Sequence, residues 1–137
     1  MPEYLLVERV PTVPEYRELR QLSGLSAKTE EAASAGLPNS RYAVVIEHEG
    51  EAIGMGRVIG DGGTAFQLTD IAVLPAHQGK GLGKRIVGAL VAWLEANAPK
   101  SAYVSLIADG PAKALYAQYG FRPTEHHGSI GMYLWMR

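Results

Sequence analysis

The sequence predicts an α/β (α+β) fold with a mixed, mostly antiparallel sheet. Short β-rich segments joined by tight turns fill the first half, and one long amphipathic helix follows them. Only one of the helical connections between predicted strands, the long helix, looks like the crossover that joins a parallel pair. The expected element order is β-α-α-β-β-β-α-β-α-β, in a single domain over residues 1–137.

Length, composition and charge narrow the class of protein. The chain has 137 residues, of which 47% are hydrophobic and 20% charged. The net charge of -1 lacks the basic excess typical of nucleic-acid binders, so no nucleic-acid partner is expected. Cysteine is absent, which excludes disulfides and thiolate ligands, and no metal site is expected. With no signal peptide and no run near the roughly 20 apolar residues of a membrane span, we expect a cytoplasmic protein without membrane contact.

In the first half, apolar spacing predicts two helices and turn residues predict a hairpin. Val13, Tyr16, Leu19 and Leu22 recur at helical spacing. The turn at residues 49–51 joins two β-rich runs. The predicted strands are residues 4–9, 41–47, 52–59 and 65–74, and the predicted helices are residues 13–22 and 29–35.

The second half begins with a glycine-rich turn at residues 75–83 and the longest helix, which Pro99 ends. A strand is predicted at residues 102–108. Asp109 then caps a short helix that runs to about residue 119, before Gly120. Residues 130–136 are predicted to form a last strand, in which Tyr133 and Trp135 are candidates for core packing or for a homodimer contact.

The turn Gln78-Gly79-Lys80-Gly81-Leu82-Gly83-Lys84-Arg85 has the properties of an anion site. Glycines let the backbone approach a ligand, and the free amides at the start of a helix attract negative charge. Three basic residues at this helix start would repel the helix dipole unless an anion binds between them. The match to a P-loop is weak because Gln78 replaces the first glycine, and the match to a dinucleotide fingerprint is weak because Lys84 replaces the third.

These residues resemble the donor-binding motif of the GNAT N-acetyltransferase superfamily, Gln/Arg-x-x-Gly-x-Gly/Ala. The preceding Ile71-Ala72-Val73-Leu74-Pro75 is similar to the strand end that the family places there. Ala112, Leu115, Tyr116, Gly120 and Phe121 match a second family motif in order. The resemblance implies the acyl-CoA N-acyltransferase fold, with helices on both faces of the sheet and a parallel strand pair that splays apart.

The resemblance also implies acetyl-coenzyme A (acetyl-CoA) as cosubstrate and assigns residues to it. The amides of the glycine-rich turn would hold the diphosphate, and the main chain at Ile71 and Val73 would pair with the pantetheine arm. Asp109 stands where the family often has asparagine, which leaves its contact with the arm open. The implied donor-binding set is Ile71, Ala72, Val73, Gln78, Gly79, Lys80, Gly81, Leu82, Gly83, Lys84, Asp109, Ala112 and Tyr116.

Transfer of an acetyl group to an amine needs an acid for the leaving thiolate and a base for the amine. The resemblance implies Tyr116 as the acid, although a core aromatic is the alternative. Asp70, in a strand beside apolar residues, is a candidate base, with a structural aspartate as the alternative. Arg57 could bind an acidic group of the acceptor, or form a salt bridge on the sheet.

The predicted activity is acetyl transfer from acetyl-CoA to a primary amine of a small molecule or peptide by direct attack. A non-catalytic acyl-CoA-binding sensor module is the alternative, and a plain nucleotide binder is a third possibility. The identity of the acceptor does not follow from the sequence.

Overall fold

The computed structural model describes residues 3–136. The chain divides into two compact units, Met1–Leu106 and Ile107–Arg137, and each is described by itself. The first unit holds the whole sheet and the three longest helices. No helix among the described residues is both long and apolar enough to cross a membrane.

The first unit is built on a five-stranded sheet whose strands lie side by side in chain order. The first three pairings are antiparallel and the last is parallel, which agrees with the predicted mixed, mostly antiparallel sheet. The strands are β1 (Tyr4–Val7), β2 (Tyr42–His48), β3 (Glu51–Gly60), β4 (Ala65–Val73) and β5 (Tyr103–Ser105).

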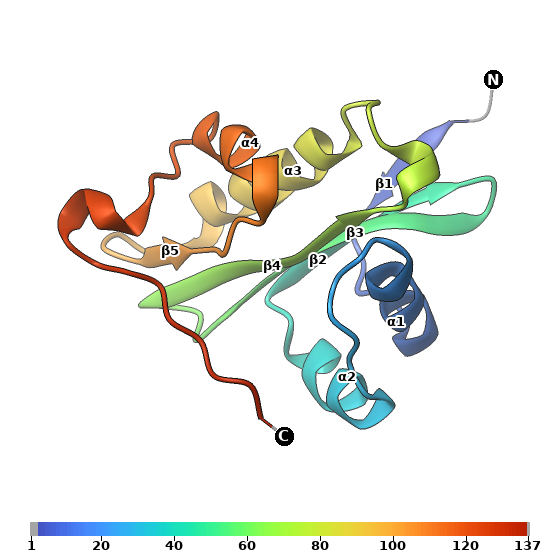
Figure 1. Cartoon of the computed structure of the whole chain (residues 1–137), viewed down its shortest axis with the longest axis horizontal. Helices are drawn as coiled ribbons and strands as arrows, with labels where there is room; N and C mark the ends of the chain where they lie inside the picture. Colours follow the sequence, from blue (N-terminus) through green and yellow to red (C-terminus); the bar gives the residue numbers. More distant parts are fainter. Residues whose placement is uncertain (1–2, 137) are drawn as a thin grey trace. The chain divides into compact units, whose positions relative to one another are not determined.

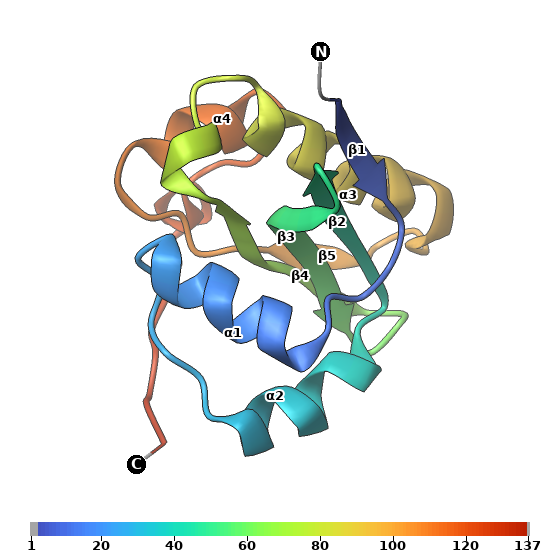
Figure 2. The ribbon, with the colours of Figure 1, turned by 90° about the vertical axis from the view of Figure 1, so that its right-hand side faces the viewer.

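Helices cover both faces of this sheet, which confirms the predicted fold class. Figure 1 shows α3 (Leu82–Asn97) above the sheet and α1 (Val13–Leu22) and α2 (Glu30–Gly36) below it. Figure 2, in which the molecule is turned by 90° about the vertical axis, shows the same placement of these helices on the two sides of the sheet. The amphipathic spacing of α1 and α3 explains this arrangement, because each helix has one apolar stripe to bury.

Each of the two helices below the sheet begins at a threonine cap. Thr12 Oγ1 accepts the Glu15 N–H at 3.3 Å, and the Glu15 carboxylate accepts the Thr12 N–H at 2.8 Å, which completes a capping box. Thr29 Oγ1 accepts the Ala32 N–H at 3.1 Å at the start of α2. These local bonds fix where α1 and α2 start, and therefore which side chains meet the sheet.

The core of the first unit has one layer on each side of the sheet. Below the sheet, residues of α1, α2, the turn η1 (Leu37–Asn39), β3 and β4 form a buried cluster of Tyr16, Leu19, Ala33, Leu37, Met55 and Ala72. Above it, Gly56 of β3 lets α3 approach closely, because a Cβ there would lie 2.5 Å from Ile86 Cγ2. The layer above the sheet includes the fully buried Ile86, Val87 and Leu90.

The parallel strand pair splays apart, as the family resemblance implied. β5 pairs only with residues Ala65–Gln67 of β4, whereas β4 continues to Val73. The predicted strand at 102–108 is thus reduced to Tyr103–Ser105. Beyond Gln67, no strand among the described residues pairs with this side of β4.

The second unit has less regular structure than the sequence predicted. It contains the single turn η3 (Gly110–Ala112), the helix α4 (Lys113–Ala117) and the turn η4 (Thr124–His127). The predicted strand at 130–136 is wrong, because these residues form no strand and all are exposed. Alternating apolar residues favour a strand, but a strand also needs a neighbour for its N–H and C=O groups, and sequence periodicity does not supply one.

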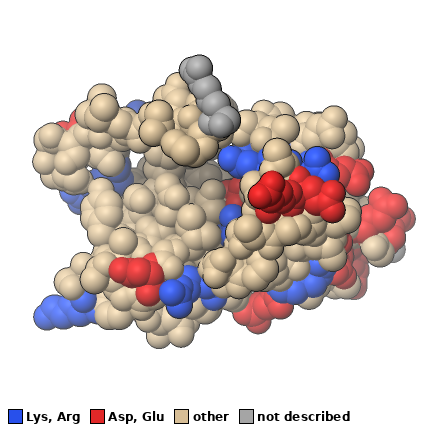
Figure 3. Space-filling view, turned by 90° about the horizontal axis from the view of Figure 1, so that it is seen from below, with Lys and Arg blue, Asp and Glu red and all other residues tan. Residues whose placement is uncertain are grey.

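On the face of the molecule seen in Figure 3, charges of both signs are mixed rather than gathered by sign. Figure 3 shows the molecule from below the view of Figure 1, with Lys and Arg side chains interspersed among Asp and Glu where α1 and α2 lie. This agrees with the near-neutral composition of 13 basic and 14 acidic residues.

Candidate active site

The glycine-rich turn joins the end of β4 to the start of α3 through the short turn η2 (Pro75–His77). Gly79 and Gly81 have φ angles of 79° and 76°, in the left-handed region that side chains with a Cβ rarely adopt. A Cβ added at either glycine would meet nothing within 4 Å. Glycine is therefore needed at these positions for backbone conformation and not for space.

The N-terminus of α3 presents backbone N–H groups without a competing carboxylate. Gly81 is the N-cap, and in this fully described helix no side chain caps the start and no acidic residue lies in the first turn. The first N–H groups of any helix lack partners within the helix. Lys80 and Lys84 are exposed beside them. The geometry matches an anion cradle made by backbone amides.

Gln78 ties this loop to the strand before it. Its side-chain amide donates to the Val73 carbonyl at 2.9 Å, which closes the loop over the end of β4. A glutamine amide can both donate and accept, so it can fix the loop without adding charge to an anion site.

A β-bulge in β4 decides which backbone groups face the open edge. Arg57 pairs with Thr69, but Met55 pairs with Ala72, so β4 has one extra residue here. Asp70, with a φ of 58°, occupies the bulge. Bulges change the direction of the residues that follow them.

Backbone hydrogen bonds on either side of the bulge show the change. Before it, the carbonyl of Thr64 faces β5 and accepts the Tyr103 N–H at 2.8 Å. After it, the Leu74 N–H donates to Ile53 of β3 at 2.9 Å. Because alternate residues of a strand point their N–H and C=O groups to the same side, Ile71 and Val73 turn theirs away from β3. These are the two residues predicted to pair with a pantetheine arm.

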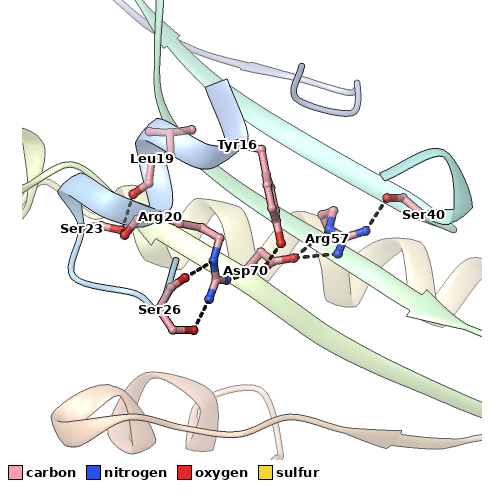
Figure 4. Close-up of polar contacts among 8 residues, drawn as sticks. All are labelled: Tyr16, Leu19, Arg20, Ser23, Ser26, Ser40, Arg57 and Asp70. Carbon is pink, nitrogen blue, oxygen red and sulfur yellow. Dashed lines mark hydrogen bonds and ion pairs between the residues drawn. The ribbon is translucent and has the colours of Figure 1, made fainter. Parts of the chain in front are cut away.

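The bulge also turns the Asp70 side chain into a buried charge network below the sheet (Figure 4). Asp70 Oδ1 accepts hydrogen bonds from Arg20 Nη1 at 2.5 Å and from the Tyr16 hydroxyl at 3.0 Å. Its Oδ2 accepts from Arg57 Nε at 2.8 Å. Asp70, Arg20 and Arg57 are 8%, 7% and 8% exposed, so three charges from α1, β3 and β4 share one buried site.

Serine residues position the two guanidinium groups of this network. Arg20 donates to the Ser26 carbonyl at 2.7 Å and to the Ser26 hydroxyl at 2.9 Å. Arg57 Nη1 donates to Ser40 Oγ at 2.8 Å. The loop before α2 and the loop before β2 are thereby attached to the sheet through charged side chains.

The neighbours of Asp70 bear on its predicted role. Both of its oxygens already accept hydrogen bonds from arginine, which favours a structural role for a carboxylate. Burial, and then the negative charge of Asp70, raise the pKa of Tyr16, so its hydroxyl stays a donor at neutral pH. The base role of Asp70 stays a prediction, and the salt bridge predicted as one alternative for Arg57 is present.

Sequence reasoning missed Tyr16 and Arg20 as members of a polar site. Tyr16 was recognised only as an apolar position of α1. Arg20 follows it by four residues and so lies on the same buried stripe as Tyr16 and Leu19. A charged residue on the buried face of a helix requires a partner, and this was the available signal.

Three predicted site residues lie in the second unit. Asp109 precedes η3 and its side chain makes no capping hydrogen bond in this fully described turn. Ala112 ends η3, and Tyr116 is the buried residue of α4. The Tyr116 ring packs edge to face against Phe121, with centroids 6.2 Å apart. Burial, and then the negative charge of Asp109, raise the pKa of Tyr116, which keeps its phenol protonated.

Comparison with known proteins identifies the family. The sequence profile of the acetyltransferase (GNAT) domain matches residues 39–123, which is more than half of the chain and extends over both units. The chain belongs to the GNAT acetyltransferase family. A probable acetyltransferase of unknown function from methicillin-resistant Staphylococcus aureus has a similar structure, with a TM-score of 0.92 and 46% identity. The match covers 98% of this chain and 100% of that one.

Two further proteins are similar at lower sequence identity, and this chain covers a smaller share of their length. A mycothiol acetyltransferase of Corynebacterium efficiens is 29% identical over 115 residues, which are 79% of this chain and 32% of that protein. The chain thus spans about a third of the length of that curated relative. The structure of Rv2747 from Mycobacterium tuberculosis, in complex with CoA, shares the fold with a TM-score of 0.65 and 20% identity, covering 85% of this chain and 72% of that one.

Proposed function

We propose that this GNAT protein transfers an acetyl group from acetyl-CoA to a primary amine of a small molecule or peptide, with Tyr116 as general acid. The observation that carries the proposal is the glycine-rich loop with its left-handed Gly79 and Gly81, at the start of a helix whose amides face no carboxylate. The open edge of β4 directly precedes this loop in the chain. A diphosphate bound at the loop and an extended arm bound along β4 would therefore lie next to each other.

The donor fits these places by its chemistry. The diphosphate would accept hydrogen bonds from the amides of residues 79–83, and the pantetheine amides would pair with Ile71 and Val73 as an added strand does. The carbonyl of Val73 is bonded to Gln78, so the Val73 N–H is the group left for that pairing. The complex of the Mycobacterium tuberculosis relative with CoA supports the same donor, and the name of the Corynebacterium relative supports acetyl as the group transferred.

The reaction balances as a direct transfer. The neutral amine attacks the thioester carbonyl, a C–N bond forms, and the C–S bond breaks as the oxyanion collapses. The thiolate takes a proton from the Tyr116 hydroxyl, and the amine nitrogen releases a proton to solvent, from which Tyr116 is reprotonated. Since Tyr116 has a raised pKa, it is a weaker acid than an ordinary phenol, so its contribution should lie near the lower end of the usual range, about a hundredfold.

The test is release of free thiol from acetyl-CoA in the presence of a panel of amines, with Tyr116→Phe compared with the wild type. We expect about a hundredfold lower turnover in the variant, with coenzyme A affinity by calorimetry within about twofold of wild type. Tyr119→Phe is the matched control, three residues along the same segment, and should keep its turnover.

Each outcome has a defined consequence. Equal turnover in Tyr116→Phe removes the acid role. Binding of coenzyme A by the wild type without thiol release for any amine supports the sensor module instead. Absence of coenzyme A binding contradicts both.

A further inference from the structure

A pocket below the sheet borders the buried charge network. It has a volume of about 220 Å³ and lies among α1, α2 and β3. Its polar lining comes from Tyr16, Lys28 and Arg57, and the rest is formed by small and apolar residues of α2 and the following turn. All of these residues lie in the first unit. The pocket is therefore a property of one compact part of the chain.

The charges around this pocket do not balance. Two buried guanidinium groups, Arg20 and Arg57, share one carboxylate, Asp70, which leaves a formal charge of 2 - 1 = +1 in the network. Tyr16 adds none, because burial raises its pKa and keeps it neutral. Lys28 also lines the pocket, and the lining includes no acidic residue. A buried positive charge that is not fully balanced is costly, so the excess of one in the network favours an anion beside it.

We propose that this pocket binds the anionic group, a carboxylate or a phosphate, of the amine acceptor. The inference rests on the proposed acetyl transfer and narrows its acceptor from any primary amine to an amine that carries a negative group.

The geometry of Arg57 supports this role. Arg57 contacts Asp70 through Nε and Nη2 and Ser40 through Nη1, which uses one N–H group at each nitrogen. A guanidinium has five N–H groups in a rigid fork that matches carboxylate and phosphate oxygens, so donors remain for a ligand. Asp70 holds this fork in place, and the hydroxyl of Ser40 fixes its other side. The arginine is thus oriented before a ligand arrives, which reduces the entropy lost on binding.

The chain also links the pocket to the donor site. Asp70, which holds Arg57, is the residue directly before Ile71, whose main chain faces the open edge of β4. The bulge at Asp70 therefore directs one side chain to Arg57, which lines the pocket, and the next main-chain groups to the open edge of β4. An acceptor whose anionic end is bound by Arg57 would therefore lie close to the part of β4 proposed to bind the donor.

The first experiment compares amines in matched pairs that differ only in the anionic group. Suitable pairs are ethanolamine with O-phosphoethanolamine, and butylamine with 4-aminobutyrate, each assayed by thiol release from acetyl-CoA. We expect kcat/KM to be about tenfold or more higher for an anionic member, because one charged hydrogen bond contributes that much. The pair that shows the larger increase in kcat/KM identifies which of the two anions, phosphate or carboxylate, the pocket prefers.

The variant that tests the pocket is Lys28→Gln, which removes a positive charge without touching the Asp70 contacts. We expect it to reduce the preference for the anionic amine by about fivefold, through KM rather than kcat. Lys100→Gln is the control, because Lys100 is exposed after α3 and its loss changes the net charge equally. Lys100→Gln should keep the preference of the wild type.

The second experiment measures the pocket without turnover. Inorganic phosphate and propionate are titrated into the protein by NMR in the presence of saturating coenzyme A, which blocks the glycine-rich loop. We expect a saturable shift of the Arg57 Nε–H signal for at least one of these anions, with weaker binding in Lys28→Gln and unchanged binding in Lys100→Gln.

The two experiments separate failure of this inference from failure of the proposed function. Turnover of neutral and anionic amines at equal rates, with no anion shift at Arg57, overturns the pocket assignment and leaves acetyl transfer intact. Absence of turnover with every amine contradicts the proposed function, and the NMR titration then decides the anion site alone. An equal effect of Lys28→Gln and Lys100→Gln would show that the preference for anionic amines comes from the overall charge of the protein. This result would overturn the assignment.

Discussion

The glycine-rich loop and the network around Asp70 are built by opposite means. The loop is one continuous segment, and its binding groups are backbone amides whose positions depend on Gly79 and Gly81. The network takes Tyr16 and Arg20 from α1, Arg57 from β3 and Asp70 from β4, up to 54 residues apart in sequence. A local site can be recognised as a motif, whereas a site of side chains from distant elements exists only once the chain has folded. Substitutions should therefore affect binding in the first and stability in the second.

The largest expected effect is that of Asp70→Asn on stability. The change removes the counter-charge of two buried arginines, and breaking such a pair costs about 3–5 kcal/mol. Asparagine also tolerates the left-handed φ of 58° at this bulge, so the effect isolates the charge. Urea unfolding of the variant and the wild type measures the difference in free energy.

Asp109→Asn is the control for this comparison, because it makes the same chemical change at an exposed site. Its stability should change by less than about 0.5 kcal/mol. If Asp70→Asn were instead as stable as the wild type but lost turnover with a changed pH profile, Asp70 would act as the base and not as a structural anchor.

The difference between the two regions also explains what the sequence could predict. Gln78, Gly79 and Gly81 have fixed spacing after an apolar strand, so the loop was located together with its backbone role. The mostly antiparallel pairing and the splayed parallel pair were likewise predicted, since short turns join antiparallel neighbours and the family motif implies the splay.

What could not be predicted depends on pairings between distant residues. The bulge at Asp70 is a mismatch of register between β3 and β4, and nothing in the local sequence of either strand specifies it. When only the sequence is known, Asp70 looks like any other position of an alternating strand. Its partners on α1 can therefore not be inferred. The segment 130–136 shows the converse, because its strand-like pattern has no strand beside it.

A smaller effect is expected from Gly81→Ala, which tests the backbone origin of the donor site. An alanine at a φ of 76° is strained by about 1–2 kcal/mol. If the loop responds by changing its conformation, the amides move and coenzyme A affinity, measured by calorimetry, should fall about tenfold.

Gly50→Ala is a matched control for that change. Gly50 has a φ of 81° in the turn between β2 and β3, and a Cβ there would also meet nothing within 4 Å. It should lose similar stability while keeping coenzyme A affinity. Equal loss of affinity in both variants would mean that the loop responds to general destabilisation, and the local character of the site would be refuted.

The smallest effect concerns the start of α1, which carries Tyr16 and Arg20. Glu15 accepts hydrogen bonds from Arg9 Nη1 at 2.8 Å and Nη2 at 2.9 Å, and these lower its pKa from 4.5 to about 2. A lowered pKa in the folded state stabilises the fold above the unfolded value, and this contribution is lost as the pH falls from about 4.5 to about 2. Because the pair is partly exposed, Glu15→Gln should cost only about 0.5–1 kcal/mol at neutral pH.

Urea unfolding across that pH range tests this assignment, with Glu18→Gln on the same helix as the control. Glutamine can still accept the Thr12 N–H of the capping box, so the variant removes the charge but not the cap. The stability difference between Glu15→Gln and the wild type should shrink toward zero near pH 2, and Glu18→Gln should show no such trend. Coenzyme A affinity at neutral pH should be the same in all three proteins, because the donor loop takes its shape from its own glycines. A pH-independent difference, or a parallel loss of coenzyme A affinity, would show that the two regions are coupled through α1.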